Sequence, residues 1–330
     1  MVWCAMGSMA DPWRLCVAPM LDWTDRHFRY FARLITRHTR LYSEMVTTGA
    51  LIHGDRARFL RFDPSEHPLA LQLGGSDPQE LALCARMGAD AGFDEINLNV
   101  GCPSDRVQNG RFGACLMAEP ALVAEAVAAM KAAVAIPVTV KTRIGIDDRD
   151  SAEELAAFTA HQVAAGCDAL IVHARKAWLK GLSPRENRDI PPLRYDRVLQ
   201  LKREFPQLPM ILNGGITTID QTRQWLTEFE GVMIGREAYQ NPWLLASVDR
   251  ELFGSPHPDP QPRAVLDALM PYVEQQRSAG VPLNSISRHL LGLFQGAPGA
   301  RAWRRYLSEH ATQPGATAEV LRQAAAQVRI

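Results

Sequence analysis

Residues 94–103 read DEINLNVGCP. Apolar Ile96, Leu98 and Val100 alternate with polar residues, which predicts a buried β-strand. Gly101 permits backbone geometries that other residues resist, and proline at 103 cannot continue a strand. The stretch therefore presents the Cys102 thiol at the carboxyl end of a strand. In a parallel barrel, functional groups collect at that end of the sheet.

Seven other short apolar segments have the same character. They alternate with segments of helical periodicity from about residue 15 to 252, and they cover residues 15–20, 41–45, 69–73, 138–142, 169–173, 210–213 and 231–234. Strands that are apolar along their whole length belong to parallel sheets covered by helices on their faces. Eight such units in about 240 residues match a (β/α)8 TIM barrel. The predicted fold class is therefore α/β.

The competing α/β fold is an open, doubly wound sheet. That fold carries a GxGxxG phosphate-binding motif after its first strand, whereas this chain has APM at residues 18–20. Helix starts fit the barrel units. Thr24 is predicted to cap the first helix, Asp77 precedes a proline at the first turn of another, and Ser151 with Glu154 forms a capping box.

The chain after the predicted barrel has a different character. Residues 255–262, SPHPDPQP, place proline at every second position, which predicts a stiff, extended linker. Residues 263–330 show helical periodicity without strand patterns. We therefore expect a loose N-terminal tail (1–13), a catalytic barrel (14–254), the linker (255–262) and a small all-α C-terminal domain (263–330).

Composition excludes several classes of protein. Lysine plus arginine and aspartate plus glutamate each number 36, so no global excess of positive charge indicates nucleic-acid binding. Basic residues nevertheless outnumber acidic ones within residues 175–204 and 255–330, which allows a local basic face. Six cysteines without CxxC or zinc-type spacing indicate free thiols, a reducing compartment and no metal site. No apolar run approaches the ~20 residues that span a bilayer, and residues 1–10 lack the pattern of a secretion signal. We expect a cytoplasmic protein.

Glycine-rich turns follow the seventh and eighth predicted strands. They contain Asn213, Gly214 and Gly215 in one case, and Gly235 with Arg236 in the other, and each leads to a helix. Backbone N–H groups in these two loops form the common phosphate site of TIM barrels. Arg236 can add a bidentate contact. A phosphate-bearing ligand is therefore predicted.

Three further strand-end residues suggest what carries the phosphate. The Gln72 amide, the Lys141 ammonium and the His173 imidazole match the polar edge of an isoalloxazine ring, where Lys141 would stabilise the negative charge of a reduced flavin. A rival interpretation makes Lys141 the Schiff-base lysine of an aldolase. The residues alone leave both interpretations open.

Cys102 has three interpretations. It is an inert buried cysteine, a nucleophile activated by a nearby positive group, or a general acid. An ordinary thiol, with a pKa of about 8.5, is mostly protonated at neutral pH and can donate a proton. Asn97 and Asn99 lie close by in the sequence and have the donors and acceptors to bind a nucleobase.

Together these motifs resemble the tRNA-dihydrouridine synthase family. The resemblance runs from about Cys16 through the helical tail, and its motifs are APM (18–20), QLGG (72–75), NLNVGCPS (97–104), VKTR (140–143), IVHAR (171–175), NGGI (213–216) and GR (235–236). Residues 42–50, 106–110 and 176–184 resemble a bacterial subgroup, A, of that family.

The resemblance implies a TIM-barrel flavoenzyme that uses FMN and NADPH to reduce uridines 20 and 20a in the D-loop of tRNA. Hydride would add to C6 of uracil, Cys102 would protonate C5, and Asn99 would orient the base. By the same resemblance, FMN is held by Ala18, Pro19, Met20, Gln72, Lys141 and His173. Its phosphate is held by Asn213, Gly214, Gly215, Gly235 and Arg236.

Two basic clusters are the candidate contacts to tRNA. One lies in the segment after the sixth strand and contains Lys180, Arg185, Asn187 and Arg188; the other lies in the tail and contains Arg301, Arg304 and Arg305. Two alternatives remain, a flavin barrel acting on a small molecule and an RNA-binding protein with a non-catalytic barrel. No protein partner is implied.

Overall fold

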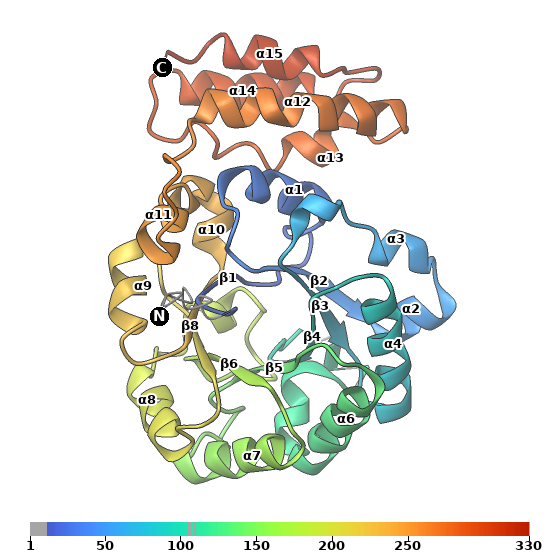
Figure 1. The fold of residues 1–330 in the computed structure, drawn as a ribbon, viewed down its shortest axis with the longest axis vertical. Helices are drawn as coiled ribbons and strands as arrows, with labels where there is room; N and C mark the ends of the chain where they lie inside the picture. The colour runs from blue at the N-terminus through green and yellow to red at the C-terminus, as the bar shows by residue number, and fades with distance from the viewer. Residues whose placement is uncertain (1–11, 105–106, 109, 330) are drawn as a thin grey trace, which may run out of the picture.

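A computed structural model describes residues 12–104, 107–108 and 110–329. In this part of the chain, eight parallel strands form one sheet in which consecutive strands from β2 to β8 pair with one another and β1 pairs with β8. The strands are β1 (Leu15–Val17), β2 (Leu41–Thr47), β3 (Leu69–Gly74), β4 (Glu95–Val100), β5 (Val138–Arg143), β6 (Ala169–His173), β7 (Met210–Asn213) and β8 (Gly231–Ile234). A parallel bridge between Cys16 and Arg40 joins β1 to the start of β2. The sheet therefore closes into a barrel (Figure 1).

Helices surround the barrel, as the sequence predicts. They are α1 (Arg26–Ile35), α2 (Thr48–His53), α3 (Arg56–Leu60), α4 (Pro78–Asp90), α6 (Pro120–Ala133), α7 (Ala152–Ala164), α8 (Tyr195–Glu204), α9 (Ile219–Trp225), α10 (Arg236–Gln240) and α11 (Val248–Phe253). The short α2 and α3 were not expected. The (β/α)8 architecture is confirmed.

Two of the three predicted helix caps are present. Asp77 accepts hydrogen bonds from Gln79 and Glu80 N–H, and the capping box of Ser151 and Glu154 is complete. Thr24 is not the cap of α1, however. Its hydroxyl is hydrogen-bonded to the backbone of Met20, and Asp25, one residue later, caps the helix.

The side chains on the two faces of each strand have different surroundings. On β4, Ile96, Leu98 and Val100 point outward into the large hydrophobic core beneath the helices. Asn97 and Asn99 alternate with them and therefore point into the barrel. A small second apolar cluster, which includes Tyr42 and Met233, fills part of the interior. The remaining interior is polar and leads to the carboxyl ends of the strands.

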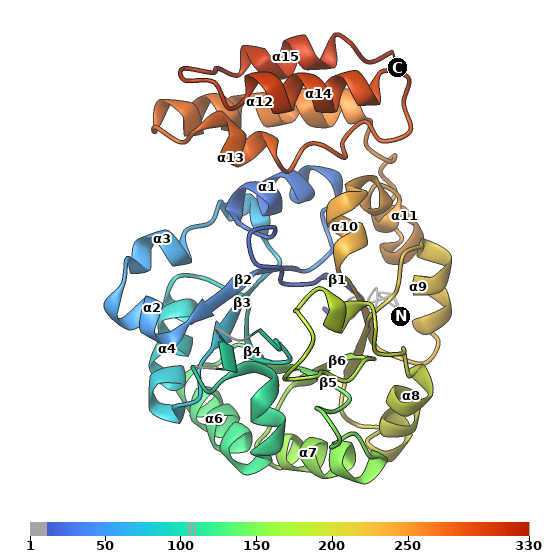
Figure 2. The same cartoon turned by 180° about the vertical axis from the view of Figure 1, so that it is seen from behind.

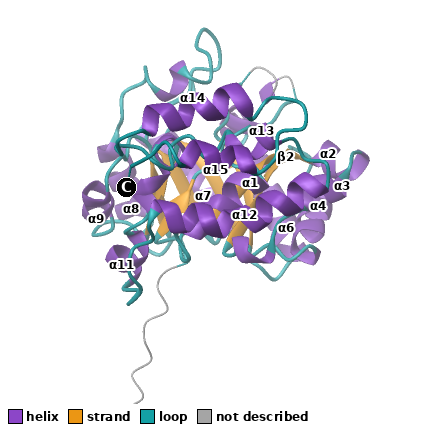
Figure 3. Ribbon diagram, turned by 90° about the horizontal axis from the view of Figure 1, so that it is seen from above, coloured by secondary structure: helices purple, strands orange, loops and turns teal. Residues whose placement is uncertain are grey.

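The C-terminal part is helical and lies on one side of the barrel, next to α1 and α10 (Figures 1 and 2). It contains α12 (Pro262–Ser278), α13 (Leu283–Ser287), α14 (Ala300–His310) and α15 (Glu319–Ala325). Viewed from above, these helices cover one side of the strands (Figure 3). Fully buried Trp303 packs edge-on against Phe294 and donates its indole N–H to Leu290 O. Pro262 is the first residue of α12, so the extended segment ends one residue earlier than expected.

Aromatic contacts join α12 to α1. Tyr272 stacks on Tyr30 with ring centroids 3.9 Å apart, and its hydroxyl lies 2.7 Å from Nδ1 of buried His27. The helical part is therefore tied directly to the first helix of the barrel.

The predicted tail lies almost entirely outside the described residues. Trp13, which the sequence interpretation placed in that tail, is buried and donates its indole N–H to Glu95 inside the barrel. Within the described segments, no helix combines the length and apolar character needed to cross a bilayer.

Candidate active site

The predicted site residues come from neighbouring strand ends. Register pairs Asn99 of β4 with Lys141 of β5, and His173 of β6 with Asn213 of β7. Gln72 lies on β3 and donates a hydrogen bond from Nε2 to Asn97 Oδ1 at 2.7 Å. Residues 18–20 follow β1, and the backbone N–H of residue 18 still bonds β8. One mouth of the barrel therefore brings together the groups that the sequence selected separately.

Cys102 sits on a braced turn. The backbone N–H groups of Gly101 and Cys102 donate to Asn99 Oδ1 at 3.1 and 3.0 Å. Arg143 Nε donates to Gly101 O at 2.9 Å from the neighbouring strand. The thiol is partly exposed and lies 3.5 Å from Ser104 Oγ. A thiol held in this way is available to a ligand in the barrel mouth.

The pKa of Lys141 is shifted by its surroundings. Its Nζ donates to Asn213 Oδ1 at 3.1 Å. Burial, followed by the positive charge of Arg143, lowers the pKa of Lys141 to about 7; Cys102 opposes this shift, and Arg188 adds the smallest lowering effect. No carboxylate is among the described groups that shift this pKa. Because a lysine in such surroundings lacks a counter-charge, the site favours an anionic ligand.

His173 is held in the neutral form. Burial, together with the charges of Arg143, Lys141 and Arg175, keeps the pKa of His173 well below its ordinary value. Among the described residues, its buried Nδ1 has no hydrogen-bond partner. Buried polar atoms are normally paired, so this nitrogen is the atom that a bound group would satisfy.

Glycine turns follow β7 and β8, where the sequence predicts a phosphate. Gly214 and Gly215 have φ values of 115° and 70°, and Tyr195 donates its hydroxyl to Gly214 O at 2.6 Å. Gly235 directly precedes α10, and an added Cβ there would contact only the Cβ of Ala18 within 4 Å, at 3.9 Å. After β7 the helix is farther away than expected, because α9 begins only at Ile219. At the turn after β7, the donors to a phosphate would therefore be the N–H groups of the turn itself and not those of a helix end.

Arg236 already forms an ion pair within the protein. Its guanidinium donates to the Asp189 carboxylate at 2.7 Å, and both side chains are partly exposed. Positive side chains, the unpaired His173 nitrogen and the uncrowded backbone at Gly235 together suit a planar group that carries a phosphate. The residues of this site therefore fit FMN.

Asn99 has little capacity left for a nucleobase. Its Oδ1 accepts the two backbone N–H groups of the Cys102 turn, and its Nδ2 donates to Gln72 Oε1 at 2.9 Å. One amide N–H remains, so Asn99 can offer a base a single donor.

One predicted tRNA contact is wrong. Asn187 is completely buried, and its amide bonds the backbone of Trp178, Leu182 and Ser183. It shapes the segment after β6 and cannot reach a ligand, because a buried amide with saturated hydrogen bonds has nothing to offer one. Lys180, Arg185 and Arg188 in the same segment are exposed, as the prediction requires.

A cleft of about 650 Å³ lies between the barrel and the helical part. Arg301 and Arg304 line it, whereas Arg305 is exposed but is not one of its lining residues. Trp23, stacked on Tyr239 with centroids 4.4 Å apart, lines it from the barrel side. Sequence reasoning missed this aromatic pair and Arg288; Arg143 and Arg175, which end the VKTR and IVHAR motifs, were given no role. Arg143 follows Lys141 by two positions on β5, a strand spacing that puts both on the same face. Arg175 lies beyond the end of β6, and its backbone N–H donates to His173 O.

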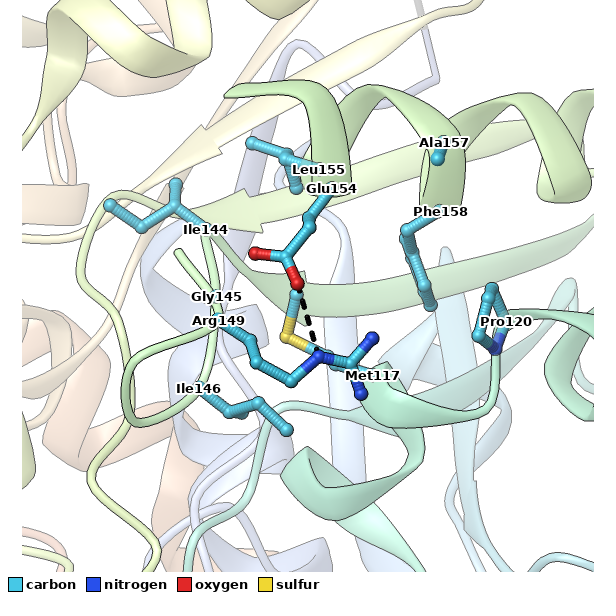
Figure 4. A pocket seen from close by; sticks show the side chains of 10 residues that line it. All are labelled: Met117, Pro120, Ile144, Gly145, Ile146, Arg149, Glu154, Leu155, Ala157 and Phe158. Atoms are coloured by element: carbon cyan, nitrogen blue, oxygen red, sulfur yellow. Dashed lines mark hydrogen bonds and ion pairs between the residues drawn. The ribbon is translucent and has the colours of Figure 1, made fainter. Parts of the chain in front are cut away.

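A second, smaller pocket of about 90 Å³ lies between the loop after β5 and α7 (Figure 4). Arg149 Nε and Glu154 Oε1 pair across it at 3.1 Å, and most other lining residues are apolar. It contains none of the predicted site residues.

Comparison with known proteins identifies the family. Residues 16–329 match the family model described as Dihydrouridine synthase (Dus). The chain belongs to the dihydrouridine synthase family.

Relatives match almost end to end. The chain is 60% identical over 321 residues to a protein of Vibrio vulnificus (strain CMCP6) named tRNA-dihydrouridine(20/20a) synthase, covering 97% of this chain and 98% of the relative. Proteins of the same name from Shewanella oneidensis (strain MR-1) and Escherichia coli (strain K12) are 62% and 61% identical, covering 93% and 94% of this chain and 92% and 90% of the relatives.

A solved structure shares the fold. A 2-naphthoyl-CoA reductase complex superposes with a TM-score of 0.58 over 72% of this chain and 50% of its own, at 10% identity. At that identity the likeness shows the fold alone.

Proposed function

We propose that this dihydrouridine synthase reduces uridines 20 and 20a of the tRNA D-loop to 5,6-dihydrouridine, using FMN and NADPH. The name shared by relatives about 60% identical over almost the whole chain supports the substrate and its positions. The observation that carries the chemistry is the partly exposed Cys102 thiol on a braced turn, in the same barrel mouth as Lys141 and His173.

Each group has a role in this proposal. Bound FMN would supply a hydride for C6 of the uracil ring, with NADPH as the source of its electrons. Gln72, Lys141 and His173 hold the ring, with residues 18–20 beside it. The turns at 213–215 and 235–236 hold the phosphate. Lys141 in its ammonium form would stabilise the negative charge of the reduced ring.

Cys102 acts as the general acid. As the C5–C6 double bond is reduced, negative charge develops at C5 and the O4 carbonyl, and the thiol proton passes to C5. The resulting thiolate regains a proton from water. Hydride and proton together account for the two electrons and two hydrogens of the product. The free amide N–H of Asn99 helps to orient the base.

We assign residues 14–254 to a catalytic domain and 263–330 to a tRNA-binding domain. The target uridine must leave its stack to enter the barrel. Arginines line the cleft between the two parts, which supports the proposal that the RNA backbone runs along it. Exposed Lys180, Arg185 and Arg188 then contact phosphates from the other side of the mouth.

The direct test uses purified protein, NADPH and unmodified tRNA. The proposal expects a yellow protein whose bound cofactor is FMN, and dihydrouridine at positions 20 and 20a by position-resolved mapping. Reduction of free uridine at a comparable rate would instead indicate an enzyme of small molecules. RNA binding without any bound flavin would indicate a non-catalytic scaffold.

A further inference from the structure

A buried carboxylate lies inside the barrel, away from the carboxyl ends of the strands. Glu95 is the first residue of β4 and is completely inaccessible to solvent. Its two oxygens accept hydrogen bonds or ion pairs from Trp13, Arg40, Tyr42 and Thr139. The closest of these contacts is the Thr139 hydroxyl, at 2.5 Å from Oε1. Glu95 therefore anchors the buried end of the barrel interior.

A line of hydrogen bonds rises from this anchor toward the barrel mouth. Thr139 Oγ1 accepts from Asn97 Nδ2 at 2.8 Å, and Asn97 Oδ1 accepts from Gln72 Nε2 at 2.7 Å. Gln72 Oε1 in turn accepts from Asn99 Nδ2 at 2.9 Å. The line ends where Asn99 Oδ1 receives the backbone N–H groups of the Cys102 turn. We call Glu95, Thr139, Asn97, Gln72 and Asn99 the relay.

The direction of every bond in the relay is fixed at both ends. At one end the carboxylate can only accept, and Trp13 and Arg40 beside it can only donate. At the other end the backbone N–H of Cys102 can only donate. A chain of amides between a pure acceptor and a pure donor has one arrangement that satisfies all its bonds. Reversing any amide would leave two donors or two acceptors facing each other, which is costly in a buried site.

We propose that Glu95, Thr139 and Asn97 are positioning residues for the proton donor. None of the three reaches the mouth itself, since all are completely buried. They act through Gln72 and Asn99, whose amides they hold in one orientation. Asn99 then holds the Cys102 turn, and buried Gln72 joins Asn99 to the rest of the relay. The inference rests on the proposed role of Cys102 as general acid.

A substitution at Thr139 can interrupt the relay with little change of shape, because valine is nearly isosteric with threonine and lacks the hydroxyl. Thr139→Val is compared with Thr139→Ser, which restores the hydroxyl, and with Thr142→Val. Thr142 is a matched control: it is on the same strand and equally buried, but its hydroxyl bonds the backbone of Arg143 and not the relay. If Thr139→Val fails to load flavin, Thr139→Ala removes the hydroxyl without adding a methyl group near Glu95.

The expected result has two parts. At saturating FMN, NADPH and tRNA, kcat of Thr139→Val falls about tenfold with the KM for tRNA unchanged, while Thr139→Ser and Thr142→Val stay within about twofold of wild type. Site-resolved mass spectrometry of alkylation at fixed pH shows at least a threefold change at Cys102, and no change at partly exposed Cys115.

Three outcomes would overturn the inference. They are an unchanged kcat and Cys102 alkylation rate in Thr139→Val, equal losses in Thr139→Val and Thr142→Val, or a failure of serine to restore the rate. Failure of the proposed function is seen separately. A fully active Cys102→Ala enzyme would remove the acid role, while the alkylation measurement on Thr139→Val would still report whether the relay positions residue 102.

Discussion

The backbone N–H of Cys102 donates to Asn99 Oδ1 at 3.0 Å, and the same side chain donates from Nδ2 to Gln72 at 2.9 Å. The turn that carries the thiol is therefore connected to the part of the barrel mouth assigned to the flavin. A substitution at either place should alter the geometry of the other, because one planar amide is hydrogen-bonded to both.

Replacement of Cys102 by alanine should separate binding from chemistry. The turn is held through the backbone, so Cys102→Ala should keep its FMN and its thermal unfolding midpoint. Turnover on unmodified tRNA should fall by about 10²–10⁴-fold, the usual contribution of a general acid. Cys115→Ala, which removes the other partly exposed thiol of the described chain, should remain active. Wild-type turnover in Cys102→Ala would refute the acid role.

The order of strands was predictable from the sequence because each strand is short, apolar and closed by a turn residue. Strands β6, β7 and β8 begin and end at the predicted residues. Strand ends of a parallel barrel must meet at one rim, so Lys141, His173 and Asn213 could be grouped without coordinates.

Side-chain pairing over long distances was not predictable. The Thr24 and Asp25 caps differ by one residue, and the choice depends on which side chain bonds the first N–H groups of the helix: Asp25 accepts from His27 and Phe28, while the Thr24 hydroxyl bonds Met20. Asn187 lies among basic surface residues, and nothing local reveals that its amide is buried. The Gln72–Asn97 bond joins residues on different strands, and a single sequence does not show such a pairing.

The charge of Lys141 should make flavin binding depend on pH. Because its pKa is lowered to about 7 in the flavin-free protein, the ammonium is largely present at pH 6 and largely lost at pH 9. Affinity for reduced FMN should therefore weaken by about tenfold as the pH rises across this range.

Lys141→Met provides the comparison. Its affinity should be weak at pH 6 and should lose the part of the pH dependence that belongs to Lys141. Fluorescence titration of the flavin-free proteins under anaerobic conditions measures both. Parallel pH profiles for the two proteins would show that Lys141 does not face the ring.

Acid should loosen the contact between α1 and α12. Burial is the main cause that lowers the pKa of His27 to about 4, against the charge of Asp25, which raises it; Arg26, His289 and Arg288 lower it further. The unfolded chain takes up this proton below about pH 6.5 while the folded protein resists, so stability is lost as the pH falls from about 6.5 to 4. Between pH 7.5 and 5 the loss attributable to His27 should be about 2 kcal/mol.

His27→Gln isolates this contribution, because glutamine keeps an acceptor for the Tyr272 hydroxyl and does not titrate. Urea denaturation at pH 7.5 and 5 gives the free energy of unfolding for each protein. The variant should lose about 2 kcal/mol less than wild type between the two pH values. Equal losses in both would show that the imidazole is not the titrating group.

The helical part should bind tRNA through the cleft rather than through its whole basic surface. Arg301 and Arg304 line the cleft, and Arg305, adjacent on α14 and equally charged, does not. Each phosphate contact contributes about 0.7–0.9 to the slope of log affinity against log salt concentration. Arg301→Ala and Arg304→Ala should therefore each reduce the slope for unmodified tRNA by nearly that amount, whereas Arg305→Ala should change it by less than half as much. Filter binding at several KCl concentrations measures the slopes. If Arg305→Ala reduces the slope as much as Arg301→Ala does, general surface charge accounts for binding and the cleft is not the path of the RNA backbone.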